Sequence, residues 1–443
     1  MIDRTPAVET RAARRRSAPG AFAALEHPQY RWLYASNQLF FLAMAAQQVV
    51  RSWLAFHLTS SELALGYVSL AVALPMLVTS PLGGALGDRV ERRRLILWAQ
   101  GVVVVSESVM LGLLVSGALE FWHLLSATFL MGCVFPFIMP ARQAIVVNIV
   151  GKRGLANAMA LQMAGINATR VIGPMAGLLI GPFGVEAAYA LGVAAYAAAW
   201  LLLLPVQRAH PQVVDDRPSI AADIVEGARY LGRHRVVLAL LVFGLVPMFL
   251  AMPFQTLLVV FAEDVWQWGT TGFGLLSAAA GVGGVVGSGY MARYSERGDR
   301  LGLMLKSMLA FGGFLFLFAI CPWFVVALPL VLAATACSSI FITVNNAAIQ
   351  LLIPDRVRSR VSSFLIMSFS LPMLGTLPVA ALAEWQGAAV AVATASVLAT
   401  LAALAYYFAS PSLRGVDRSV EDAMDDDAAE LPPDSPLQPA LVK

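Results

Sequence analysis

Apolar runs of about 20 residues recur between residues 33 and 409, each long enough to cross the hydrocarbon core of a bilayer as a helix. No alternation of strand and helix patterns separates these runs. Charged residues make up only 13% of the 443 residues, whereas an average soluble domain carries about 25%. So little charge cannot cover a water-exposed surface. The sequence therefore predicts an all-α integral membrane protein.

Twelve runs are predicted to be transmembrane helices, because a bilayer accepts only helices and closed barrels, and a barrel would show alternating strands of about ten residues. The predicted spans are residues 33–56, 63–86, 95–117, 122–147, 158–181, 187–206, 237–261, 272–292, 301–321, 323–349, 362–383 and 387–409. The predicted organisation is an N-terminal tail (1–32), a first six-helix half (33–206), a central loop (207–236), a second six-helix half (237–409) and a disordered, acidic C-terminal tail (410–443).

The basic residues give the orientation of this layout. Of the 30 Lys and Arg residues, only Arg51 and Arg170 fall well inside spans, and the others lie in or beside the loops and tails of one side. This positive-inside bias predicts that both termini are cytoplasmic. The first 29 residues are rich in arginine but have no apolar signal region, so we expect no cleaved signal peptide. The predicted location is the inner (plasma) membrane of the cell, with multiple spans.

The sequence has no pattern typical of an enzyme, a cofactor site or a metal site. It contains neither a phosphate-binding loop nor a nucleophile elbow, and Cys133, Cys321 and Cys337 lack metal-ligand spacing. The net charge of +3 does not indicate nucleic-acid binding, because the arginines serve topology and no aromatic residues interleave them. The expected partners are a small-molecule substrate, protons and the lipid bilayer, and we expect a monomer.

A weak internal repeat links the two halves. A shift of 203 residues places Ala141–Ala158 on Val344–Val361, and each segment is the end of a fourth helix that runs into a basic turn. The low identity does not prove duplication, but the topology agrees with it.

The segment "GALGDRVERRRL", Gly84 to Leu95, concentrates charge between two apolar runs. It resembles the signature G-x-L-a-D-R-x-G-R-R-x-L that joins helices two and three of the major facilitator superfamily, except that Glu91 stands where Gly is usual. This difference is typical of the branch that contains enterobactin exporters and macrolide efflux proteins. The segments "HPQYRWLYASNQ", "PARQA", "NATRVIGPMAG" and "IPDRVRSRV" are similar to that branch too. The resemblance covers roughly residues 27 to 409.

The resemblance implies a twelve-helix transporter whose two halves rock to expose the substrate to alternate sides. It also implies that the Asp of the loop pairs with the start of a helix of the other half, here near Ser362, in the outward-open state. The residues assigned to this conformational latch are Gly84, Asp88, Arg89, Arg92 and Arg93. For the arginines, holding a short turn in the cytoplasm is an alternative main role.

Four ionisable residues lie at membrane depth, where charge is costly and a functional role is the default hypothesis: Arg51, Glu107, Arg142 and Arg170. Glu107 and Arg170 are predicted to share a depth near the midplane and to compensate each other. Glu107, the only carboxylate placed deep within a span, is the candidate proton-coupling site. The alternative is a protonated Glu107 bonded to a neighbouring serine or a carbonyl, because helix three is usually peripheral in the superfamily.

Polar residues in central spans are predicted to line a substrate cavity. Arg51, toward the outer end of its span, is expected to face an outward vestibule, and Arg142 either lines the cavity or extends its head to the cytoplasmic interface. The candidate cavity residues are Gln38, Gln47, Gln48, Arg51, Arg142, Gln255, Asn345 and Asn346.

A glycine–proline motif in the fifth span, Gly173, Pro174 and Gly177, resembles a shortened form of a motif described for antiporters of the superfamily. Gly permits close helix approach and Pro bends the helix. The predicted function is a secondary active, proton-coupled exporter of an amphipathic or hydrophobic compound such as a drug or a siderophore. The alternatives are an importer or facilitator of a metabolite or lipid, and a membrane sensor or scaffold without transport.

Overall fold

The computed structural model describes residues 22–87, 90–207, 229, 231–294, 299–353 and 371–422. Within these ranges every regular element is helical, which confirms the all-α fold class. Ten stretches are long and apolar enough to span a membrane. One of them, Asn157–Leu203, contains two spans, and the predicted span 362–383 is described only from residue 371 onward. The described helices therefore agree with a total of twelve.

The first half contains the 3-10 turn η1 (Ala23–Glu26), α1 (Pro28–Thr59), α2 (Leu63–Gly87), α3 (Arg92–Val115), α4 (Phe121–Ile172), the 3-10 turn η2 (Gly173–Ala176) and α5 (Gly177–Leu203). Two sharp turns interrupt α4 and α5 at Gly151 (φ 67°) and Gly184 (φ 85°), where glycine allows the positive φ. The fourth predicted span therefore ends at the first turn, and the fifth and sixth lie on either side of the second.

The second half contains α7 (Arg235–Ala251), α8 (Phe254–Val260), the single π-turn η3 (Phe261–Val265), α9 (Gly269–Tyr294), α10 (Arg300–Ile320), α11 (Phe324–Leu352), α13 (Thr376–Gln386), α14 (Ala388–Ala409) and the short α15 (Pro411–Arg414). The seventh predicted span, residues 237–261, is not one continuous helix. Its break falls at Met252 and Pro253, because proline has no amide hydrogen to continue the ladder.

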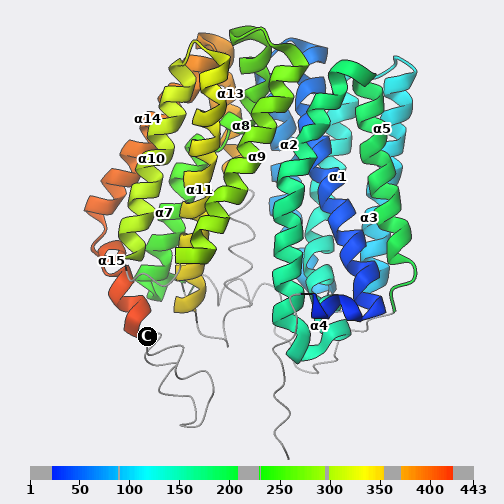
Figure 1. Cartoon of the computed structure of the whole chain (residues 1–443), viewed down its shortest axis with the longest axis horizontal. Coiled ribbons are helices and arrows are strands. Elements are labelled where there is room, and N and C mark those ends of the chain that lie inside the picture. Colours follow the sequence, from blue (N-terminus) through cyan, green and yellow to red (C-terminus); the bar gives the residue numbers. More distant parts are fainter. Residues whose placement is uncertain are drawn as a thin grey trace, which may run out of the picture.

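The two halves form two helical bundles side by side (Figure 1). Helices α1 to α5, blue to green, make one bundle, and α7 to α15, green to red, make the other. The first and last described residues both lie at the lower end of this view. Between the bundles, α2 packs against α13 and α9 packs against α5 and η2.

The start of the C-terminal tail, predicted to be disordered, is instead folded onto the second half. After Ser410 the chain forms α15 and a further helical turn, and Leu413, Val416 and Val420 are buried. The Asp417 carboxylate accepts hydrogen bonds from the backbone amides of Arg300 (3.0 Å) and Leu301 (3.2 Å). Asp417 thereby satisfies amides at the start of α10 that have no partner within the helix. The remainder of the predicted tail, residues 423–443, lies outside the described ranges.

Candidate transport site and the charged network of the first half

A buried ion pair joins three helices of the first half. The Arg51 guanidinium on α1 donates from Nη2 to Oε1 of Glu107 on α3. The Tyr189 hydroxyl on α5 donates to Oε2 of the same carboxylate, at 2.6 Å. Glu107 is 1% exposed and Arg51 is 7% exposed. Both carboxylate oxygens thus have a donor, which is the condition under which a buried charge is tolerated.

The predicted pairing of Glu107 with Arg170 stays a prediction, and the described structure gives Glu107 two other partners. The partners of Glu107 are Arg51 and Tyr189, and the side chain of Arg170 lies outside the described part of the chain. The ion pair forms because α1 and α3 both pack against α5 and bring the two charges to the same level. The peripheral position expected for helix three also does not apply at Glu107, which faces the interior of the bundle.

Two of the predicted cavity residues are used to hold this bundle together. Gln47, one turn before Arg51 on α1, is buried and donates from Nε2 to the backbone carbonyl of Tyr189 at 3.0 Å. Arg51 faces Glu107 rather than an open vestibule. Tyr189, which the sequence analysis did not single out, therefore contacts the network through both its hydroxyl and its carbonyl. The available signal was a tyrosine among alanine and leucine residues in a span that also contains Tyr196.

Arg142 on α4 differs from Arg51, since its side chain is fully buried and unpaired. It is 1% exposed, and its guanidinium lies over the Phe40 ring of α1, 4.7 Å from the ring centroid. None of its three guanidinium nitrogens has a hydrogen-bond partner in the described structure. The suggestion that Arg142 extends to the cytoplasmic interface is therefore wrong, because Phe40 and the surrounding apolar cluster enclose the head group.

The other predicted cavity residues differ in exposure. Gln48 on α1 and Gln255 on α8 are exposed, and Asn346 on α11 is half-buried. Asn345 is buried, its Oδ1 has no hydrogen-bond partner in the described chain, and its amide lies close to Gly244 of α7. Gln38 is half-buried against Gly165, and both polar atoms of its amide lack partners there. This set therefore retains unsatisfied hydrogen-bonding groups in both halves.

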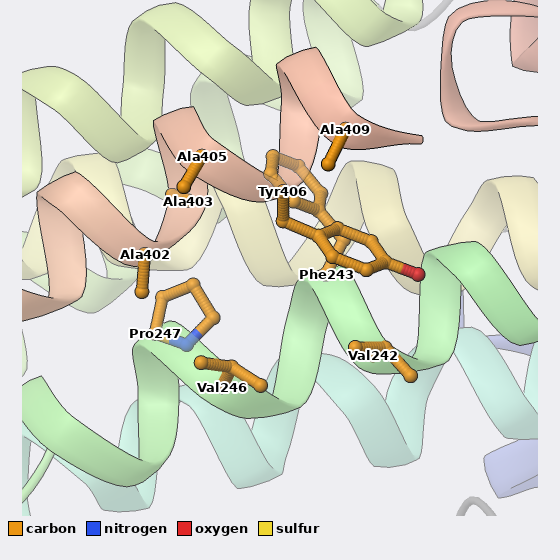
Figure 2. Close-up of a pocket in the computed structure, with 9 residues that line it drawn as sticks. All are labelled: Val242, Phe243, Val246, Pro247, Ala402, Ala403, Ala405, Tyr406 and Ala409. Carbon is orange, nitrogen blue, oxygen red and sulfur yellow. The ribbon is translucent and has the colours of Figure 1, made fainter. Parts of the chain in front are cut away.

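Two grooves among the described residues lie within single halves and contain none of these polar residues. Figure 2 shows the first, a groove of about 300 Å³ between α7 and α14, where the rings of Phe243 and Tyr406 lie side by side and Pro247 lines the groove apart from them. The second, of about 650 Å³, lies between α3 and α4 and is lined mainly by apolar residues such as Trp98 and Leu130. Neither groove includes residues of both halves, so neither has the position expected of a transport site.

The glycine–proline motif lies where the two halves meet. A Cβ atom on Gly177 would lie 3.2 Å from Cα of Gly274 on α9, and a Cβ on Gly274 would lie 2.7 Å from the backbone nitrogen of Leu178. Gly173 is similarly close to Ala45 of α1. The absence of side chains at Gly177 and Gly274 therefore allows a backbone-to-backbone crossing between the halves.

Polar contacts close the same end of the interface, opposite the chain termini. The Glu384 carboxylate on α13 accepts from the Ser61 hydroxyl (2.7 Å) and from the backbone amide of Leu63 (3.0 Å), the first residue of α2. Trp53 Nε1 donates to Glu263 across the interface at 3.3 Å. Burial and the neighbouring Glu384 raise the pKa of Glu62 in the connecting loop. We call Trp53, Ser61, Leu63, Glu263 and Glu384 the polar seal.

Comparison with known proteins agrees with these observations. A family described as "Transmembrane secretion effector" matches residues 19–437. The chain belongs to this family of major facilitator transporters. It is 30% identical over 311 residues to the enterobactin exporter EntS of Shigella boydii, with 67% of this chain and 71% of the exporter covered. It is 22% identical over 257 residues to macrolide efflux protein A of Streptococcus pyogenes, with 57% and 64% covered.

Solved structures support the major facilitator fold. The nucleoside transporter NupG aligns with a TM-score of 0.68 at 13% identity, over 86% of this chain and 99% of that one. A bacterial homologue of the lysosomal transporter Spinster aligns with a TM-score of 0.65 at 14% identity, over 92% of this chain and 99% of that one. The predicted superfamily and branch are thus confirmed, and the protein is a multi-pass membrane transporter rather than an enzyme.

Only part of the predicted latch can be placed in this secretion effector. Gly84 lies in the last turn of α2, and Asp88, Arg89 and the region of Ser362 lie outside the described residues. Arg93, at the start of α3, donates to the backbone carbonyls of Leu203 and Leu204 at the end of α5. Arg93 therefore links two helices of its own half. Arg92 beside it is half-buried, and its Nε has no hydrogen-bond partner in the described chain.

Proposed function

We propose that this protein is a secondary active exporter that works by alternating access, with both termini in the cytoplasm of the cell whose inner membrane it spans. The observation that carries the proposal is the contact between the halves at one end of their interface. The glycine crossing at Gly177 and Gly274 and the polar seal lie at one end, opposite the termini. With cytoplasmic termini, the protein is closed toward the outside in this conformation.

Export of an amphipathic or hydrophobic compound is supported by the relatives. Both the enterobactin exporter and the macrolide efflux protein are named for outward movement of such molecules. The amides of Gln48 on α1 and Gln255 on α8 are exposed, so each half has a hydrogen-bonding group free to contact a substrate. The alternative is an importer or facilitator on the same fold. The similarity to the nucleoside transporter concerns the fold alone and therefore does not decide the direction of transport.

The direction of transport can be measured with purified protein in liposomes of known orientation. We expect a lipophilic dye to leave the cytoplasmic side and accumulate on the external side when the external side is acidic. Collapse of the proton gradient should abolish accumulation. Gradient-driven movement toward the cytoplasmic side would support an importer, and no gradient-dependent movement of dye, macrolide or siderophore would support a sensor or scaffold. We also propose that the monomer is the active unit. Transport by liposomes that contain on average less than one protein molecule each would support this.

We propose that Glu107 is the proton-coupling residue. Arg51 is its positively charged partner, a role that the sequence had suggested for Arg170. Protonation of Glu107 would remove the negative charge that holds Arg51, and the freed arginine would then need another anion. The link between α1, α3 and α5 would loosen as a result. Arg170, close in sequence to Gly173 and Pro174, is kept as a second midplane charge in this proposal.

The variant Glu107→Gln tests coupling. We expect it to lose proton-driven accumulation while it retains downhill exchange of the substrate, because glutamine keeps hydrogen bonds to Arg51 and Tyr189 but cannot titrate. The measurement is dye accumulation as a function of external pH. The double variant Arg51→Gln/Glu107→Gln serves if the unpaired arginine prevents folding. An unchanged pH profile in both variants would move the coupling site elsewhere.

The variant Asp88→Asn tests the latch. Since acidic residues contribute little to membrane orientation, the protein should still insert and fold. We expect transport to fall severely and the population to move toward the inward-open state, as measured by thiol labelling of cysteines placed on either side of the interface. Arg94→Gln, which removes only an exposed charge paired with Glu91 at 3.2 Å, is the matched control in the same loop. Normal transport by Asp88→Asn would leave the loop with a topological role alone.

A further inference from the structure

Arg142 is a buried positive charge that the fold does not compensate. Its side chain is enclosed, its three guanidinium nitrogens lack hydrogen-bond partners in the described structure, and its one recorded interaction is with the Phe40 ring. A cation–π contact offsets only part of the cost of removing a guanidinium from water. A side chain in this state is expected to have an anionic partner in some step of the working cycle.

Arg51 in the same half provides an internal comparison. Its charge is neutralised by Glu107, which also accepts from Tyr189. Glu107 is the only Asp or Glu that the sequence places within the six predicted spans of this half. The first half therefore has one carboxylate within its spans, Glu107, for the two buried arginines Arg51 and Arg142. Glu107 already binds Arg51. The six spans of this half therefore leave no carboxylate for Arg142.

The surroundings of Arg142 favour an organic anion with an apolar body. Phe40 lies below the guanidinium, and Tyr196 packs edge-on against Phe40 at 5.4 Å between ring centroids. Asn37 stands one turn before Phe40 on α1 and so on the same face, and both polar atoms of its buried amide lack partners in the described chain. A charged donor, a neutral amide and two aromatic rings suit an aromatic or apolar molecule with an acidic oxygen.

The helix that carries Arg142 can open this site. Pro140 lies two residues before it in α4, and Pro136 lies one turn earlier. Because Pro140 has no amide hydrogen, the ladder of α4 lacks a bond at this point and the helix bends more easily. Rocking of the halves thus has a local hinge beside the buried charge.

We propose that Arg142 binds the anionic group of the transported substrate, a carboxylate or phenolate on a largely apolar molecule, in a conformation that opens α4. This inference rests on the proposed exporter function, whose substrate class it narrows. A small inorganic anion from the cytoplasm offers the same charge and is the other source to be distinguished. In this proposal, the conformation of the structure is the one in which Arg142 is enclosed and no anion is bound.

The test uses two dyes that share a tricyclic xanthene ring and differ in charge, fluorescein (anionic) and rhodamine 123 (cationic). Binding to the full-length protein in detergent is measured by fluorescence anisotropy, and export is measured in liposomes. We expect the wild type to bind both dyes and Arg142→Met to lower the fluorescein-to-rhodamine affinity ratio by about tenfold or more, because only fluorescein uses the charge. Arg142→Lys should recover part of the ratio. Arg414→Met, which removes an exposed arginine, should leave it unchanged.

The experiment distinguishes failure of the proposed anion site from failure of the proposed exporter function. If fluorescein binds as tightly to Arg142→Met as to the wild type, or does not bind to the wild type, the anion site is refuted. If the site is occupied by an inorganic anion, replacing chloride and phosphate with gluconate will weaken binding of both dyes to the wild type equally, and this too overturns a substrate anchor. Fluorescein binding that depends on Arg142 without export would refute the exporter function and keep the site. The unfolding temperature of Arg142→Met should not fall, since no partner is orphaned.

Discussion

Replacing Gly274 with alanine is expected to block closure of the halves at the end opposite the termini. The added Cβ would lie 2.7 Å from the backbone nitrogen of Leu178, and a backbone atom cannot rotate away as a flexible side chain can. Overpacking of this kind costs about 1–3 kcal/mol. Because the clash exists only in the closed conformation, the equilibrium should move away from it by about 5–150-fold. Transport should fall accordingly, and cysteines introduced by mutation at the polar seal should become more accessible to an external thiol reagent.

The same helix supplies the control for this prediction. A Cβ on Gly284 of α9 would meet nothing within 4 Å, so Gly284→Ala should transport at the wild-type rate. Both variants should unfold at wild-type temperature, since the Gly274 clash involves contacts between the halves rather than within one. Wild-type transport by Gly274→Ala would mean that the crossing is looser in the working protein, and the assignment of this end as the closed end would have to be abandoned.

The largest loss of stability is expected from Arg51→Met. The substitution leaves the Glu107 carboxylate buried with Tyr189 as its remaining donor, and removal of one partner of a buried pair costs about 3–5 kcal/mol. The double variant Arg51→Met/Glu107→Leu should recover most of that loss, because it removes both charges together. The measurement is the unfolding midpoint in detergent for the two single variants and the double variant.

The unfolding temperature of Arg142→Met can be compared with that of Arg51→Met. Both substitutions replace a buried arginine of the first half, and only Arg51 leaves a charged partner behind. The expected order of unfolding temperatures is therefore Arg51→Met lowest, followed by wild type, with Arg142→Met equal to or above the wild type. Equal losses for both arginines would indicate that the pair contributes packing and little electrostatic compensation.

Hydrophobic length was sufficient to predict the helices, the basic residues predicted their orientation, and the resemblance of the segment Gly84–Leu95 to a family signature predicted the superfamily. These signals are strong because each span must satisfy its backbone alone and each basic loop must avoid crossing the bilayer. The pairing of charges could not be predicted in the same way. Arg51 and Glu107 each stand eight residues before the last residue of their helix, which places them at one level. The predicted spans ended at residues 56 and 117 instead, and those small errors at the helix ends concealed the match.

The direction in which a side chain points from its helix could not be predicted from the sequence either. Near the end of a span, an arginine reaches water if it points outward and is trapped if a neighbouring helix covers it. Arg142 is covered by α1 through Phe40, a contact between residues about a hundred positions apart in the chain. The helical start of the C-terminal tail was missed for a related reason. Its acidic composition is typical of disorder, but Asp417 finds the free amides at the start of α10.

The hydrogen bond that the Leu63 amide donates to Glu384 gives the transport cycle a signature in amide hydrogen exchange. Leu63 begins α2, so its amide has no acceptor within its own helix, and the acceptor in this conformation belongs to the opposite half. Each separation of the halves at this end breaks that hydrogen bond and frees the amide for exchange, while the amides farther along α2 keep their bonds. Deuterium uptake at the first turn of α2 therefore reports openings toward one side of the membrane, with no reporter group attached to the protein and no substrate.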